Sequence, residues 1–137
     1  MTTIYVPRDS AATSVGADEV AAAIEREAEV AGVEVTLVRT GTRGMLWLEP
    51  LVEVATERGR VGYGPVRPDE VAGLVADGML QGAHHHLCLG PVEELPWMRD
   101  QQRLCLARVG VTTPRHGRPV EGATGRQAAE GLQARDQ

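Results

Sequence analysis

The N-terminal part of the chain alternates between strand and helix patterns, and this alternation constrains the fold more than any other feature. Residues 3–6 form a short apolar run that Pro7 closes, which is typical of a strand. Residues 17–31 repeat apolar side chains at helical spacing, with acidic residues in the first turn and Gly32 as the terminator. Residues 33–38 alternate and are rich in β-branched side chains, so they predict a second strand. Together these segments predict a right-handed βαβ unit with parallel strands.

The next segments extend this unit. Residues 51–55 and 60–63 are strand-like, and the short polar connection between them suits a hairpin. After Gly64 and Pro65 interrupt the pattern, Pro68 opens a second helix, since proline is favourable in a first helical turn. The apolar stripe of that helix consists of Val71, Leu74, Val75 and Met79. The order β-α-β-β-β-α predicts an α/β fold of the thioredoxin-like type, with a four-stranded mixed sheet and flanking helices.

The composition limits both the core and the partners. Aromatic residues make up 3% and Phe is absent, so the core must consist of Val, Leu, Ile and Ala. The net charge of −5, without a basic cluster, argues against nucleic acid and anionic membranes as partners. No apolar run approaches the roughly 20 residues of a membrane-spanning helix. The N-terminus lacks the features of a signal peptide, so we expect a cytoplasmic protein.

The C-terminal part differs in character. We expect one thioredoxin-like domain over residues 1–86 and a linker over residues 87–113, containing a short apolar stretch at 87–89, a short helix at 96–102 and an extended piece at 104–107. Residues 114–137 are rich in Gly, Arg, Ala and Gln. Because such a segment buries too little apolar surface to offset its ordering entropy, we expect a disordered tail.

Several blocks of sequence resemble a known family. They are residues 2–10 (TTIYVPRDS), 16–21 (GADEVA), 47–54 (WLEPLVEV), 62–66 (GYGPV), 96–104 (PWMRDQQRL) and 107–111 (ARVGV). Over residues 1–113 the chain resembles the start of the beta (flavoprotein, or diaphorase) subunit of NAD-dependent formate dehydrogenases. That family is related to the [2Fe-2S] and NADH-binding subunits of complex I. The resemblance implies a thioredoxin-like domain of the [2Fe-2S] ferredoxin type, which precedes a large domain that binds FMN, NAD and an iron–sulfur cluster.

The cluster ligands of that family are missing here. The [2Fe-2S] relatives carry a C-x4-C pair after the first strand and a C-x3-C pair in a later loop. In this chain residues 6–12 contain no cysteine, and Thr42 and Leu46 stand at the second pair. Neither a hydroxyl nor an isobutyl group can replace the thiolates that hold iron in such clusters. We therefore expect a degenerate cluster loop, with no catalytic, metal or cofactor site in this chain.

The resemblance also implies the assembly. FMN, NAD and iron–sulfur clusters would belong to the implied complex, and the partners would be other subunits or domains of the formate dehydrogenase. The chain has no Gly-rich flavin- and NADH-binding loop and no C-x2-C-x2-C motif. It would therefore be a component of an oxidoreductase that is not catalytic alone, with a structural or docking role. An N-terminal part of a complex I-like or hydrogenase diaphorase subunit is an alternative.

The loop from Gly41 to Pro50 contains the candidates for docking. Met45, Leu46 and Trp47 can fill the space of the missing cluster, and Trp47 can pack on the strand that follows. Alternatively, Trp47 and Trp97 are partly exposed anchors for a neighbouring domain or subunit, as aromatic residues often are in interfaces. Arg43, beside the loop, is a candidate for the same contact.

Two other groups of residues suggest chemistry. His84, His85 and His86 raise the alternative of a small metal-binding protein, with Cys88 as the one near partner. No further ligand lies at a zinc-like spacing, so a polar surface turn is the favoured interpretation. Cys88 and Cys105 are too far apart for a C-x-x-C redox motif and are more typical of small buried hydrophobic residues.

Overall fold

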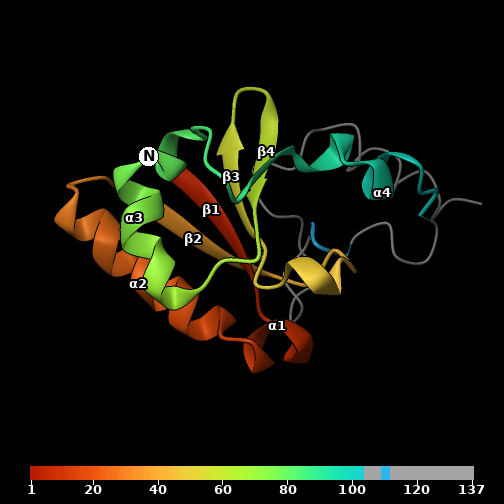
Figure 1. Cartoon of the computed structure of the whole chain (residues 1–137), viewed down its shortest axis with the longest axis horizontal. Helices are drawn as coiled ribbons and strands as arrows, with labels where there is room; N and C mark the ends of the chain where they lie inside the picture. Colours follow the sequence, from red (N-terminus) through yellow and green to blue (C-terminus); the bar gives the residue numbers. More distant parts are fainter. Residues whose placement is uncertain (104–108, 112–137) are drawn as a thin grey trace, which may run out of the picture.

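The computed structural model describes residues 1–103 and 109–111 of the chain, and its centre is a five-stranded mixed sheet (Figure 1). The strand order is β2-β1-β3-β4-β5. β1 and β2 are parallel, and the other neighbouring pairs are antiparallel. The strands are β1 (Thr2–Pro7), β2 (Val35–Thr40), β3 (Val52–Thr56), β4 (Gly59–Tyr63) and β5 (Cys88–Pro91). The predicted α/β class is confirmed, with one strand more than the four expected.

The predicted βαβ unit is present. Helix α2 (Ala17–Val30) connects β1 to β2, and its buried face consists of small and aliphatic side chains between Ala17 and Ala28. A short helix that the sequence did not predict, α1 (Ser10–Ser14), precedes it. The carboxylate of Asp9 caps α1 by accepting a hydrogen bond of 3.2 Å from the amide of Ala11.

The second predicted helix is divided into three pieces. α3 (Val71–Ala76) lies between the 3₁₀ turns η2 (Pro68–Glu70) and η3 (Met79–Gln81). η2 continues directly into α3, and the break between α3 and η3 occurs at Gly78, whose φ of +89° is incompatible with a continuing helix. The remaining short elements are η1 (Leu46–Leu48), η4 (Val92–Glu94) and α4 (Pro96–Arg99). Within the described residues, none of the helices has the length and apolar character needed to cross a bilayer.

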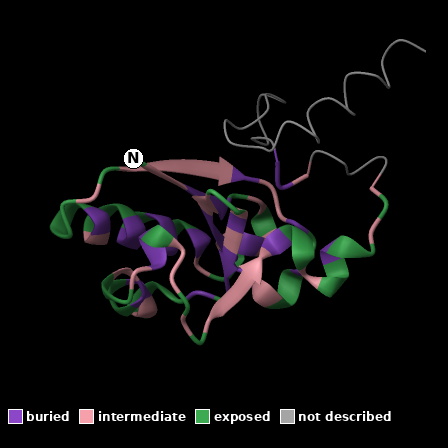
Figure 2. Cartoon of the chain, turned by 90° about the horizontal axis from the view of Figure 1, so that it is seen from above, coloured by how far each residue is buried: buried purple, intermediate pink, exposed green. Residues whose placement is uncertain are grey.

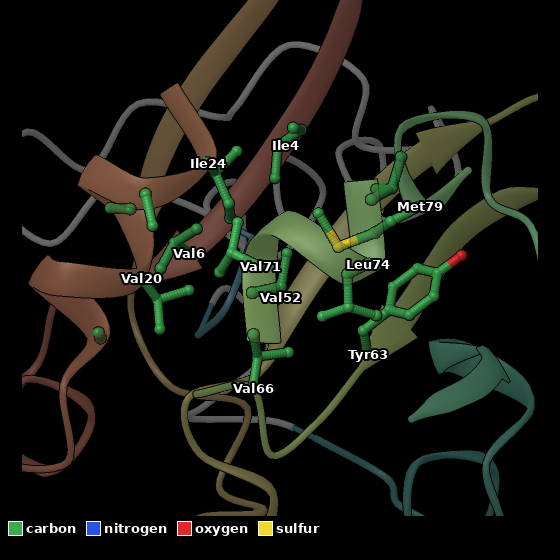
Figure 3. Packing of buried hydrophobic residues seen from close by; sticks show 14 of the residues in the cluster. Ile4, Val6, Val20, Ile24, Val52, Tyr63, Val66, Val71, Leu74 and Met79 are labelled. Carbon is green, nitrogen blue, oxygen red and sulfur yellow. The ribbon is translucent and has the colours of Figure 1, made fainter. Parts of the chain in front are cut away.

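The main core lies between one face of the sheet and helices α2 and α3 (Figures 1 and 3). As predicted, it is aliphatic, with Tyr63 as its one aromatic side chain among the described residues. Of the predicted helical stripe, Val71, Leu74 and Met79 are buried and Val75 packs against them partly. Figure 2 shows the buried residues along the centre of the molecule and exposed residues on the outer surfaces of the helices.

A smaller apolar cluster forms around β5 and the segments that follow it. Its buried members are Met45, Leu51, Val92 and Met98, and the partly buried Leu48, Leu89 and Leu95 pack against them. β5, η4 and α4 all lie in the segment that the sequence assigned to a linker. In the structure β5 belongs to the sheet, and Val92 of η4 and Met98 of α4 belong to this second cluster. The predicted extended piece at 104–107 and the tail at 114–137 lie outside the described residues.

Candidate functional site

Hydrogen bonds from its own polar side chains hold the loop between β2 and β3 together. The hydroxyl of Thr42 donates to Glu49 Oε1 over 2.7 Å and accepts from the amide of Gly44 over 3.0 Å. Glu49 Oε2 accepts from the amide of Leu51 over 2.9 Å. Burial raises the pKa of Glu49, and the hydrogen bonds from Leu51 and Thr42 partly oppose that effect. Thr42, at the first position of the degenerate pair, therefore serves the internal structure of the loop.

The same loop exposes two large apolar side chains. Leu46 and Trp47 are 58% and 59% exposed, whereas Met45 is buried in the second apolar cluster. Of the three residues expected to fill the space of a cluster, only Met45 is buried. Trp97 of α4 is 54% exposed and meets Trp47 edge to face, with ring centroids 5.3 Å apart. We call Leu46, Trp47 and Trp97 the tryptophan patch.

The two tryptophans of the patch are each next in sequence to a residue of the second apolar cluster. Leu48, at the end of η1, and Met98, next to Trp97 in α4, both belong to the second apolar cluster. Each exposed tryptophan is thus next to a side chain that anchors its element. The structure brings together two residues that are far apart in the sequence, and it holds them on two short helical turns.

Arg43 lies inside the protein, 3% exposed. Its Nε and Nη2 contact the two carboxylate oxygens of Glu53, each over 2.9 Å, and its Nη1 contacts Glu93 Oε1 over 2.7 Å. Burial alone would lower the pKa of Arg43, but the attraction of Glu53 and then Glu93 outweighs burial and raises the pKa. The sequence grouped Arg43 with the tryptophans as a docking residue. The structure instead places its guanidinium in an internal ion pair, where a partner surface cannot reach it.

A second buried arginine completes what we call the ionic cluster, Arg43, Glu53, Arg60 and Glu93. Arg60 Nη1 contacts Glu53 Oε2 over 3.3 Å, and the guanidinium carbon lies 3.6 Å from the centroid of the Tyr5 ring. Sequence reasoning missed this cluster. The available signal was Glu53 between Val52 and Val54, because strand alternation places Glu53 on the face opposite the main core.

Comparisons with known proteins identify the fold. No family model matches the chain, and no curated protein matches it. Among solved structures, the wild-type thioredoxin-like [2Fe-2S] ferredoxin from Aquifex aeolicus matches with a TM-score of 0.53 and 19% identity, over 66% of this chain and 97% of that one. A cysteine-to-serine variant of that ferredoxin matches with a TM-score of 0.55 and 20% identity, over 66% and 99%. This chain has a thioredoxin-like fold. At such identities the likeness shows the fold alone.

The loop between β2 and β3 does not contain the thiolates that hold a [2Fe-2S] cluster. At the positions that the sequence resemblance assigns to the C-x3-C pair, the hydroxyl of Thr42 is engaged with Glu49 and the side chain of Leu46 is 58% exposed. After the first strand, Asp9 caps α1. Such clusters require thiolate or imidazole ligands, so the residues of this loop do not fit the cluster.

The histidine run forms a turn before β5. His84 and His86 are exposed, and the ring of His85 lies 4.1 Å from that of His86. His85 Nδ1 accepts from the amide of Leu87, and its Nε2 lies 3.4 Å from Asp77 Oδ2. Across the described part of the chain, no three His, Cys, Asp or Glu side chains come together in a way that would hold a metal ion.

Cys88 is a free cysteine in β5 and packs partly against the main core. Burial, and then interaction with Cys88, raises the pKa of Tyr63. The hydroxyl of Tyr63 donates to the carbonyl of Ala83 over 2.5 Å. Cys105 lies outside the described residues, so its relation to Cys88 stays a prediction.

Proposed function

We propose that this chain is a cluster-free thioredoxin-like module of the diaphorase unit of an NAD-dependent formate dehydrogenase, with a docking role. The family follows from the blocks of sequence over residues 1–113 that resemble the flavoprotein subunit. The fold agrees with that resemblance, because the solved structures that it matches are thioredoxin-like [2Fe-2S] ferredoxins. We propose the cytoplasm as the compartment of this chain.

The observation that carries the docking role is the tryptophan patch. Six large hydrophobic side chains are exposed among the described residues, and three of them, Leu46, Trp47 and Trp97, form this patch. Tryptophan is enriched among the residues that dominate binding energy in interfaces. The loop that supplies thiolates in the cluster-bearing relatives here supplies no thiolate and presents an apolar surface. This surface suits an adjacent flavoprotein domain or iron–sulfur subunit.

Co-expression with the other formate dehydrogenase subunits tests the proposal. We expect the full chain to co-purify with them, and we expect Trp47→Ser and Trp97→Ser each to weaken association about 10-fold or more, since truncating a central tryptophan typically costs about 2 kcal/mol or more. Val30→Ser is the matched control, because Val30 is 80% exposed at the end of α2. Isothermal titration calorimetry measures the dissociation constants.

Two outcomes would contradict the docking role. One is a wild-type chain that never associates with the dehydrogenase subunits. The other is association that both tryptophan variants leave unchanged. Parallel titrations with complex I-like and NAD-reducing hydrogenase subunits distinguish the formate dehydrogenase assignment from its alternatives, since the cognate partner should bind most tightly.

A further inference from the structure

A short segment near residue 110 lies on the sheet face opposite α2 and α3. Strand alternation puts Tyr5 and Arg60 on that face, because Ile4 and Val6 point into the main core. Arg60 Nη1 donates to the carbonyl of Gly110 over 3.0 Å. Gly110 and Val111 are both buried. The contact joins a central strand to a residue 50 positions further along the chain.

The side chain of Arg43 passes directly beside Gly110. The backbone there has a φ of +79°, and a Cβ added to Gly110 would lie 2.5 Å from Arg43 Cδ and 2.9 Å from its Nε. Such distances do not occur between non-bonded atoms, so only glycine fits this position. A Cβ on Gly41 would lie 3.8 Å from the amide nitrogen of Gly110. The segment therefore runs alongside the start of the degenerate cluster loop.

Carbonyl groups of the segment accept hydrogen bonds from the guanidinium groups of Arg60 and Arg103. Arg103 Nη1 donates to the carbonyl of Val109 over 3.2 Å, and Arg103 Nη2 donates to the carbonyl of Arg43. Burial, and then the nearby charge of Arg43, lowers the pKa of Arg103. Among the described residues, Arg43 and Arg60 share the carboxylate of Glu53 and Arg43 also contacts Glu93, whereas Arg103 donates to backbone oxygens and to Gln101 Oε1. If the segment were removed, buried donors would lose their partners, which is costly.

We propose that residues 109–111 are a strap, held by Arg43, Arg60 and Arg103, that fixes the point at which the chain leaves the thioredoxin-like domain. The sequence assigned this segment to a linker. The strap makes residues 109–111 part of the domain and holds them beside Gly41, at the start of the loop that carries Leu46 and Trp47. The strap holds whether or not the patch binds a partner.

Backbone ¹⁵N relaxation of the full chain tests the strap. In the wild type we expect order parameters of residues 109–111 near those of the strands, about 0.85, and an NOE between Gly110 Hα and Arg43 Hδ. Gly110→Ala should reduce these order parameters below about 0.6 and remove the NOE, while the strands stay rigid. Gly32→Ala is the matched control, because Gly32 also has a positive φ, +68°, but nothing lies within 4 Å of its added Cβ.

Three results would overturn the proposal that residues 109–111 form a strap. Wild-type order parameters below about 0.6 at residues 109–111 would show a free segment. Unchanged order parameters in Gly110→Ala would show that Arg43 does not hold the segment. An equal loss of order at the segment in Gly32→Ala would show a general effect of strain. Arg103→Gln provides a second variant if Gly110→Ala does not fold, and it should also lower the order of the segment. The wild-type measurement needs no variant.

Discussion

At the scale of single residues, the main surprise is the number of charges buried on one sheet face. Arg43, Glu53 and Arg60 are 3%, 3% and 7% exposed. Removing two charges from water costs several kcal/mol per ion, and only close, well-oriented contacts offset this cost. Arg43 makes such a contact by binding both carboxylate oxygens of Glu53. Arg60 makes another through the cation–π contact of its guanidinium with the Tyr5 ring. The ionic cluster joins the loop that carries Arg43 and the turn η4 to the strands β3 and β4.

Glu49 makes a testable contribution to the pH dependence of stability. Burial raises the pKa of Glu49 in the folded chain above its ordinary value of 4.5. The folded state therefore holds this proton more tightly than the unfolded state does. As the pH rises from about 4.5 through the folded pKa, the contribution of Glu49 to stability falls. We expect the free energy of unfolding of the wild type, minus that of Glu49→Gln, to decrease over this window and to stay constant above it.

Urea unfolding from about pH 4 to about pH 8 measures this difference. Glu29→Gln is the control, because Glu29 lies on the exposed face of α2. A difference for Glu49→Gln that is flat across the window, or that rises with pH, would show that burial does not dominate the titration of this carboxyl.

At the scale of elements, one glycine tests the intrinsic stability of a helix and another tests the packing on the sheet face opposite the main core. Gly73 lies on the exposed side of α3 with nothing within 4 Å of an added Cβ, so Gly73→Ala should stabilise the domain by about 0.5–1 kcal/mol. A Cβ at Gly62 in β4 would lie 2.8 Å from Val92 Cγ2, inside the second apolar cluster. Gly62→Ala should therefore destabilise the domain by about 1–3 kcal/mol.

Denaturant midpoints of the two variants measure both effects, with equal m-values as the sign that only stability changed. If Gly62→Ala were as stable as the wild type, residues 88–99 would not pack on β4 as the structure has them. In that case the segment would behave as the linker that the sequence assigned.

Elements with strong periodicity could be predicted from the sequence, and short ones could not. Helix α2 repeats apolar residues over four turns, and the β3–β4 hairpin has β-branched runs around a polar connection. β5 was missed because it is four residues long and ends in Gly90 and Pro91. α1 has five residues and no apolar stripe, so Asp9 as a helix cap was its only signal.

In the candidate site, too, some residues could be predicted from the sequence and others could not. Trp47 and Trp97 could be singled out as rare large side chains, and Thr42 and Leu46 through a resemblance. The role of Arg43 could not be predicted, because its partners Glu53 and Glu93 are 10 and 50 positions away. Only the folded sheet brings these three residues together. A scattered arginine carries no local signal of burial.

At the scale of the whole molecule, a thioredoxin-like scaffold carries a loop without thiolates and the exposed tryptophan patch. The sequence contains two cysteines, Cys88 and Cys105, whereas a cluster held by cysteines alone needs four. Cys88 packs against the main core, and the degenerate loop contributes Met45 to the other apolar cluster. Cys88 and Met45 thus belong to different apolar clusters.

The most direct test of this account is the iron content and visible absorption of the full chain after anaerobic expression with ample iron. We predict a colourless protein without stoichiometric iron that is nevertheless folded, as circular dichroism would show. The cluster-free fold would then be established, and binding partners would be the next question. Stoichiometric iron with sulfur-to-iron charge-transfer bands would contradict the account, because Cys88, Cys105 and the histidines would then have to build a site that the loop of Thr42 and Leu46 does not provide.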